Sequence, residues 1–177
     1  MTQAITNLNI NRNLLSQAQF YFSIERLPYV TFFGQQAYLP GVAIPSVPQH
    51  TPFTKIKRHG DHIEWESFKI EFKVDEDLMN WEELFNWIKG IGSPNDFSEF
   101  EAMKKNSSSI STKGSVYSDS TLTILNSNNI PSLKIEFVDI IPTRISGLQF
   151  VTNSPGLEYL SCTAEFDYTS YKITRIL

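Results

Sequence analysis

The sequence predicts a mainly β (α+β) fold, a β-sandwich or barrel flanked by one amphipathic helix. The composition favours strands, because 13% of the 177 residues are aromatic and aromatic side chains suit half-buried pleated surfaces. Several segments alternate apolar and polar residues, whereas one short segment has the period of a helix. A chain of this length suits one domain that buries its core without disulfides.

The first strands are predicted from alternating apolar residues. Residues 18–26 place three apolar side chains on one face, and residues 29–38 resume the pattern after Pro28. Residues 61–74 have the clearest alternation, and a bulge near Glu66-Ser67 would bring Ile63 and Trp65 to the apolar side. That apolar side consists of Phe68, Ile70, Phe72 and Val74.

One amphipathic helix follows, because apolar residues recur there at i, i+3, i+4 and i+7. Asn80 with Glu83 forms a capping-box pattern at its start, and Lys89-Gly90 marks its end. Trp81 lies on the apolar stripe and is expected in the core, whereas an exposed groove involving Trp87 stays open as an alternative. The stripe consists of Trp81, Leu84, Phe85 and Ile88.

Further strands are predicted in the second half of the chain. They cover residues 120–126, 133–140, 147–151 and 157–168, with a break at Pro142 because proline removes a ladder donor. Cys162, the one cysteine, lies in the last of these and is expected to be a small buried residue without a disulfide. Residues 171–177 either continue that strand or extend away from it.

Three segments have no clear place in the core. Residues 40–53 contain four prolines and read as an ordered, extended excursion rather than a central strand. Residues 1–17 form either a disordered tail or an arm that orders on a neighbour, and residues 104–118 read as a flexible Ser-rich insertion. We therefore expect one domain over residues 18–177, with residues 40–60 contacting another subunit. The expected contact residues are Leu39, Val42, Ile44, Val47 and Phe53.

Charge and motifs argue against several functions. The net charge is −4 without a basic stripe, which disfavours a dedicated nucleic-acid binder, and the run Lys55 to His59 reads as a solvated hairpin. His59 and His62 lack the partners of a zinc site. The acids at 75–77 fit a helix start better than a general acid–base pair. We expect no enzyme, no metal and no cofactor. The chain also lacks a membrane-length apolar run and a leader pattern at its start, so we expect no export by that route.

Five short motifs resemble the tail-tube protein family of T4-like, contractile-tailed bacteriophages. They are LPGV at 39–42, the Gly-Asp turn and aromatic strand at 60–68, VDED at 74–77 before a Trp-containing helix, and the strands at 118–126 and 137–142. The resemblance spans residues 18–168. The Ser-rich insertion and the proline density of residues 40–53 depart from major tube subunits.

The resemblance implies a structural virion protein with a long projecting hairpin. Hexameric rings would stack into a DNA-conducting tail tube that meets sheath and baseplate proteins, with assembly in the host cytoplasm and no membrane contact. DNA would pass without being held, since tight phosphate binding would impede it. The alternatives are a tube initiator or terminator, the tube of a non-viral contractile injection system, and a monomeric β-sandwich module for carbohydrate.

Overall fold

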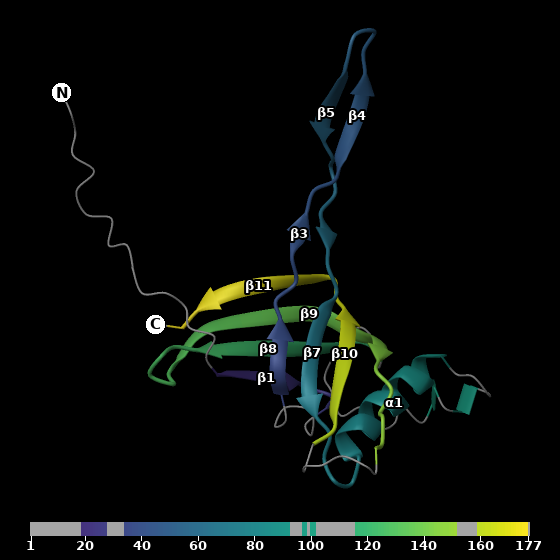
Figure 1. The fold of residues 1–177 in the computed structure, drawn as a ribbon, viewed down its shortest axis with the longest axis vertical. Coiled ribbons are helices and arrows are strands. Elements are labelled where there is room, and N and C mark those ends of the chain that lie inside the picture. Colours follow the sequence, from purple (N-terminus) through teal and green to yellow (C-terminus); the bar gives the residue numbers. More distant parts are fainter. Residues whose placement is uncertain are drawn as a thin grey trace, which may run out of the picture.

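Two antiparallel layers that share one long strand form the body of the protein (Figure 1). The computed structural model describes residues 19–27, 34–92, 97–98, 100–101, 116–151 and 159–176. The predicted arm at 1–17 lies outside these residues, and so does the Ser-rich segment up to residue 115.

The first layer has the strand order β1, β8, β9, β11. Its members are β1 (Phe20–Ile24), β8 (Ser118–Leu125), the N-terminal part of β9 (Pro131–Ile145) and β11 (Ser170–Arg175). The second layer continues from the C-terminal part of β9 through β10, β7 and β2. Its further members are β10 (Ser161–Asp167), β7 (Phe68–Lys73) and β2 (Gly34–Tyr38).

The core lies between the layers and is built largely from phenylalanines. Phe68 of the second layer is fully buried. Its ring centroid lies 4.9 Å from that of Phe22 and 4.8 Å from that of Phe137, both in the first layer. Alternation explains this arrangement, because every second residue of a strand faces the same side. The expected mainly β fold and the buried apolar faces of β1, β7 and β10 are confirmed.

Strand β9 does not break at Pro142, so that prediction is wrong. Pairing with β8 ends at Ile140, and pairing with β10 begins at Ile141. Pro142 lies just past the change of partner, so its missing N–H costs no ladder hydrogen bond to β8. Asp139 has a φ of 56°, a conformation that aspartate tolerates better than most residues, and it lies where the register between β8 and β9 shifts.

The C-terminal segment forms a strand of its own. After a turn at Tyr168 and Thr169, β11 pairs with β9 and joins the first layer. Residues 147–151 form no strand, so the strand predicted there from alternating residues is wrong. Leu148 packs partly against the core, whereas Phe150 is exposed.

The helix, α1 (Met79–Gly92), is present but is rotated relative to the predicted stripe. Trp87 is 2% exposed, whereas Phe85 is 42% exposed with Trp81 stacked on it at 5.2 Å. The apolar periodicity did not identify the buried face of the helix, because two residues of that face, Asn80 and Gly90, are not hydrophobic. The buried positions are Asn80, Leu84, Trp87 and Gly90.

Asn80 is not the N-cap, so the capping-box prediction is wrong. The helix begins before it, with the Glu82 N–H donating to the Leu78 carbonyl. The Asn80 amide instead donates to the Lys73 carbonyl at 2.8 Å and accepts from the Asp75 N–H at 3.4 Å. It therefore ties the turn between β7 and α1 to the end of β7. The helix also continues past Lys89-Gly90, to Gly92.

A long hairpin projects from the body, as Figure 1 shows. It consists of β3 (Val42–Ala43) paired with β6 (Glu64–Trp65) near the body, and β4 (Ser46–His50) paired with β5 (Lys55–His59) farther out. The predicted irregularity at Glu66-Ser67 separates β6 from β7. Trp65 is half-buried, but Ile63 is exposed on the hairpin, so only one of these two side chains turns inward.

Candidate functional site

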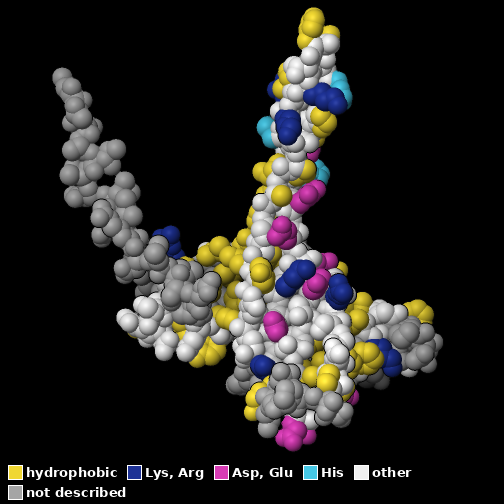
Figure 2. All heavy atoms as spheres, in the orientation of Figure 1, with side chains coloured by type: hydrophobic (Ala, Val, Ile, Leu, Met, Phe, Trp, Pro, Cys, Tyr) yellow, Lys and Arg dark blue, Asp and Glu magenta, His cyan; other side chains and the backbone are white. Residues whose placement is uncertain are grey.

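The predicted contact residues all lie on the hairpin and are exposed. Phe53 at its tip is 98% exposed and Leu39 at its base 45%. Hydrophobic side chains are spread along the whole length of the projection instead of forming one cluster (Figure 2). Apolar Ile56 and Ile63 share this exposure and were not among the predicted residues. The predicted solvated hairpin at Lys55 to His59 is confirmed, because every residue of β5 is exposed.

Two tyrosines of the C-terminal segment hold the base of the hairpin. The Tyr171 hydroxyl donates to the Pro40 carbonyl at 3.3 Å, and the Tyr168 hydroxyl donates to the Glu66 carbonyl at 2.9 Å. One bond therefore reaches each leg of the hairpin. Such bonds contribute about 0.5–1.5 kcal/mol each, and together they set the direction in which the hairpin leaves the body.

The same tyrosines belong to an aromatic cluster that joins hairpin and core. The ring of Trp65 on β6 meets Tyr171 edge-on at 5.1 Å and Tyr168 at 6.1 Å. Phe137 of the core lies 5.1 Å from Tyr168 and 5.7 Å from Tyr171. Burial, with smaller contributions from nearby Tyr171, Glu66 and Asp167, raises the pKa of Tyr168 to about 12. The hydroxyl therefore keeps its proton, and its hydrogen bond, at ordinary pH.

The Glu66 carboxylate joins the two legs of the hairpin at its base. The Gly41 N–H donates to Oε2 of Glu66 at 3.0 Å, and the Glu66 N–H donates to the Gly41 carbonyl at 3.2 Å. A Cβ added at Gly41 would lie 2.9 Å from that carboxylate oxygen. That oxygen is the end of a flexible side chain, so a larger residue at position 41 would shift the Glu66 carboxylate from its contact with the Gly41 N–H.

The outer part of the hairpin has its own turn. Thr51 and Thr54 close the tip: the Thr51 hydroxyl donates to the Thr54 carbonyl at 2.6 Å, and the Thr54 N–H donates to the Thr51 hydroxyl at 3.1 Å. Farther in, the Gly60 N–H donates to the Pro45 carbonyl at 2.7 Å. A two-stranded ribbon is marginally stable alone, so this part depends on its turn, its ladder and any partner.

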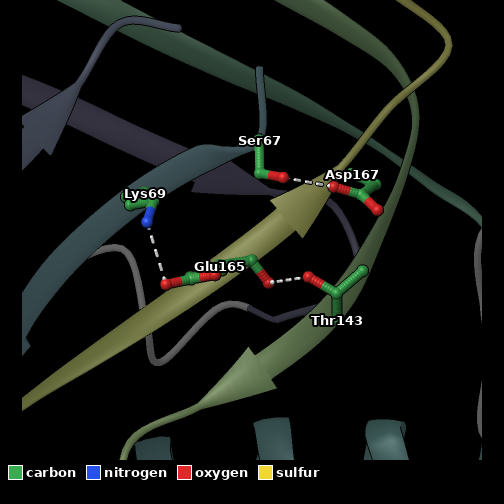
Figure 3. A network of polar contacts seen from close by, with 5 residues as sticks. All are labelled: Ser67, Lys69, Thr143, Glu165 and Asp167. Carbon is green, nitrogen blue, oxygen red and sulfur yellow. Dashed lines mark hydrogen bonds and ion pairs between the residues drawn. The ribbon is translucent and has the colours of Figure 1, made fainter. Parts of the chain in front are cut away.

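The outer face of the second layer is already paired within the chain (Figure 3). Lys69 Nζ lies 3.0 Å from Oε1 of Glu165, and the Ser67 hydroxyl donates to Oδ1 of Asp167 at 2.7 Å. The Thr143 hydroxyl donates to the Glu165 carbonyl at 3.1 Å. The alternating charge of β7 is thus explained in part by pairing with β10, without an intersubunit contact.

Two strand edges of the first layer have no partner among the described residues. They are the outer edges of β1 and β11, the first and last strands of that layer. Because the four strands alternate in direction, β11 of one copy could pair antiparallel with β1 of another. An unpaired edge is a ready template for another chain.

We find little in the described residues that would support catalysis or metal chemistry. No group of three or more His, Cys, Asp or Glu side chains in that part of the chain could hold a metal ion. Cys162 is buried, and burial raises the pKa of its thiol, which disfavours a nucleophilic thiolate. None of the described helices is long and apolar enough to cross a membrane.

Comparison with known proteins identifies the fold. A chain of the PVC sheath–tube complex, an extracellular contractile injection system in its extended state, matches with a TM-score of 0.61 and 12% identity, over 94% of this chain and 95% of that chain. The tube-terminating cap of the anti-feeding prophage matches with a TM-score of 0.62 and 11% identity, over 98% and 99%. The PVC sheath/tube terminator matches with a TM-score of 0.60 and 12% identity, over 93% and 99%.

No protein-family model matches the sequence, and neither does any curated protein. The structural likeness shows that the chain has the tail-tube type of fold, as the resemblance implied. Sequence reasoning did not find the anchoring residues Trp65, Tyr168 and Tyr171. The aromatic alternation before the chain end was visible, but nothing in it indicated a partner about a hundred positions earlier.

Proposed function

We propose that the protein is a structural subunit of the tail tube of a contractile-tailed bacteriophage. Copies assemble into hexameric rings, and the rings stack into the channel that conducts DNA. The observation that carries the proposal is the match, over nearly the full length of both chains, to chains of contractile injection machines. The protein acts by assembly and not by catalysis.

Ring formation rests on the open edges of β1 and β11. Pairing of β11 with β1 of the next copy extends the first layer into one antiparallel sheet around the ring. The contact joins two different surfaces, so it closes only when the rotation between copies completes a circle. Backbone hydrogen bonds along both edges then satisfy groups that a free copy leaves to water.

The channel wall is the face of the first layer that points away from the core. One row of paired residues across it is Ser23, Thr121, Glu136 and Lys172. Lys134 Nζ lies 2.6 Å from Oε1 of Glu136, so the charge of this lysine is paired within the face. Such a face presents few unpaired positive charges to DNA, so DNA passes through the channel instead of binding to its wall.

The hairpin makes the contacts between subunits. Residues 40–60 extend beyond a domain that covers residues 18–177, with residues 1–17 as an arm. Partners are further copies of the chain, sheath and baseplate proteins, and DNA in transit. The protein belongs to the virion tail and is assembled in the host cytoplasm. The contact residues are Leu39, Val42, Ile44, Val47 and Phe53.

A second candidate is a terminator or initiator at one end of the tube. The likeness to chains from the structures of a tube-terminating cap and of a sheath/tube terminator favours it as much as the likeness to a chain of the sheath–tube complex favours the main subunit. A subunit of a non-viral injection system would share every feature described above. Stacking separates the end component from the main subunit, because only the main subunit polymerises.

The test is assembly of the purified protein. Light scattering and negative-stain microscopy should detect rings near six times 20.3 kDa, or tubes. Replacing Ser46–His59 by an Asn-Gly turn removes the β4–β5 ladder. It keeps the pairing of Val42 with Trp65 at the base of the hairpin. This variant should fold and fail to stack. A wild-type monomer at every concentration, also in the presence of a tube template, would refute the proposal in favour of a monomeric binding module.

A further inference from the structure

The outer hairpin has two chemically different faces. Strand alternation and the β4–β5 register place Lys55 and Lys57 on one face, with His50 and His59 beside them. The opposite face carries apolar Val47 and Ile56 together with Arg58, whose Nε donates to Oε1 of Gln49 at 2.9 Å. All of these side chains are exposed. We call the first of these surfaces the basic face.

Among the described residues, neither Lys55 nor Lys57 of the basic face forms an ion pair, and the next acid in the sequence, Asp61, lies 3.2 Å from Nδ1 of His62. No acidic residue occurs between positions 40 and 60, although the chain as a whole is acidic, with a net charge of −4. His50 lies directly opposite Lys55 in the ladder. The basic face therefore gains from an acidic partner.

An acidic surface lies at the other end of the same molecule. The turn between β7 and α1 holds Asp75, Glu76 and Asp77, and the last two are exposed. Figure 1 places this turn at the bottom of the long axis and the hairpin tip at the top. The buried Asn80 amide fixes the turn to the end of β7, so the acidic residues have a defined position relative to the hairpin.

We propose that the basic face of the hairpin docks on the β7–α1 turn of a second copy stacked head to tail. Charge complementarity selects the occupant: the basic face of one copy meets the acidic β7–α1 turn of the next. This contact rests on the proposed tube function and names the partner surface that the hairpin would use between rings. Exposed ion pairs are screened by salt, so stacking weakens as ionic strength rises.

The experiment uses charge reversal in the full-length chain. One variant carries Lys55→Glu and Lys57→Glu, a second carries Glu76→Lys and Asp77→Lys, and a third combines all four. Lys104→Glu with Lys105→Glu is the matched control, because it changes the net charge by the same amount outside the hairpin. Sedimentation and negative-stain images measure the protein concentration at which rings stack.

The first two variants should form rings but need at least about tenfold more protein to stack. The combined variant should return to the wild-type concentration, because both partner surfaces are reversed together. Wild-type stacking by the first variant would refute the docking contact, and so would combined reversal that fails to restore it. Loss of rings would assign the hairpin to contacts within a ring. Absence of rings in the wild type would instead refute the proposed tube function.

Discussion

Trp65 is predicted to hold the hairpin on the body, and Trp65→Ala tests this. The change deletes two edge-on ring contacts, at 5.1 Å to Tyr171 and 6.1 Å to Tyr168. Aromatic pairs of this kind contribute about 0.5–1.5 kcal/mol each beyond burial. The variant therefore loses about 1–3 kcal/mol of attachment, while the phenylalanine core between the layers stays intact.

Hydrogen exchange at the base measures this loss. The Glu66 N–H, which donates to the Gly41 carbonyl at 3.2 Å, exchanges when the legs of the hairpin open locally. A loss of about 1–3 kcal/mol accelerates that exchange roughly 5- to 150-fold. Amides of β9 and β10 that exchange through local openings should keep their exchange rates, because those openings leave the Trp65 contacts in place.

Phe53→Ala is the matched control, since that side chain is 98% exposed and lies at the tip. It should leave exchange at the base unchanged. Tyr171→Phe separates ring from hydroxyl, because it keeps the contact with Trp65 and removes only the bond to the Pro40 carbonyl. An unchanged Glu66 exchange rate in Trp65→Ala would refute the anchoring role.

Three further predictions concern stability. Phe68→Ala leaves a cavity among the core rings and should lower the free energy of unfolding by about 3–5 kcal/mol in urea titration. Asn80→Ala leaves the Lys73 carbonyl without its 2.8 Å donor and should cost about 1–3 kcal/mol by the same measurement. The raised pKa of Tyr168, about 12, stabilises the fold fully below about pH 10, and this contribution is lost as pH rises through about 12. Tyr168→Phe should flatten that alkaline loss, and an equally steep loss would contradict the assignment.

The body of the fold was predictable where local pattern and burial agree. Phe68, Ile70 and Phe72 alternate and are all buried, because a strand packed on one side repeats every two residues. The pattern failed where a core position is not apolar or where context overrides propensity. Asn80 is buried because it binds backbone groups of the preceding turn, and Pro142 continues a strand because β9 changes partners there.

The candidate site was predictable in its composition but not in its anchoring. Apolar and proline-rich residues that fit no strand of the core, such as Val42 and Phe53, are exposed on the hairpin. The hydrogen bond between Tyr171 and Pro40 joins residues 131 positions apart in the sequence. Local periodicity cannot predict a contact between residues so far apart. Its existence depends on β11 turning back to pair with β9, which the sequence left open.

The exposed hairpin must also be kept from pairing with others before assembly. An apolar ribbon with free edges invites association between chains, and natural proteins limit this with proline and lysine at such edges. Pro48 on β4 lacks an N–H donor, and its ladder partner Lys57 on β5 carries charge. Two basic faces that meet repel each other, whereas a basic face that meets the acidic turn is attracted. The same lysines would therefore discourage pairing of two basic faces and favour one direction of stacking.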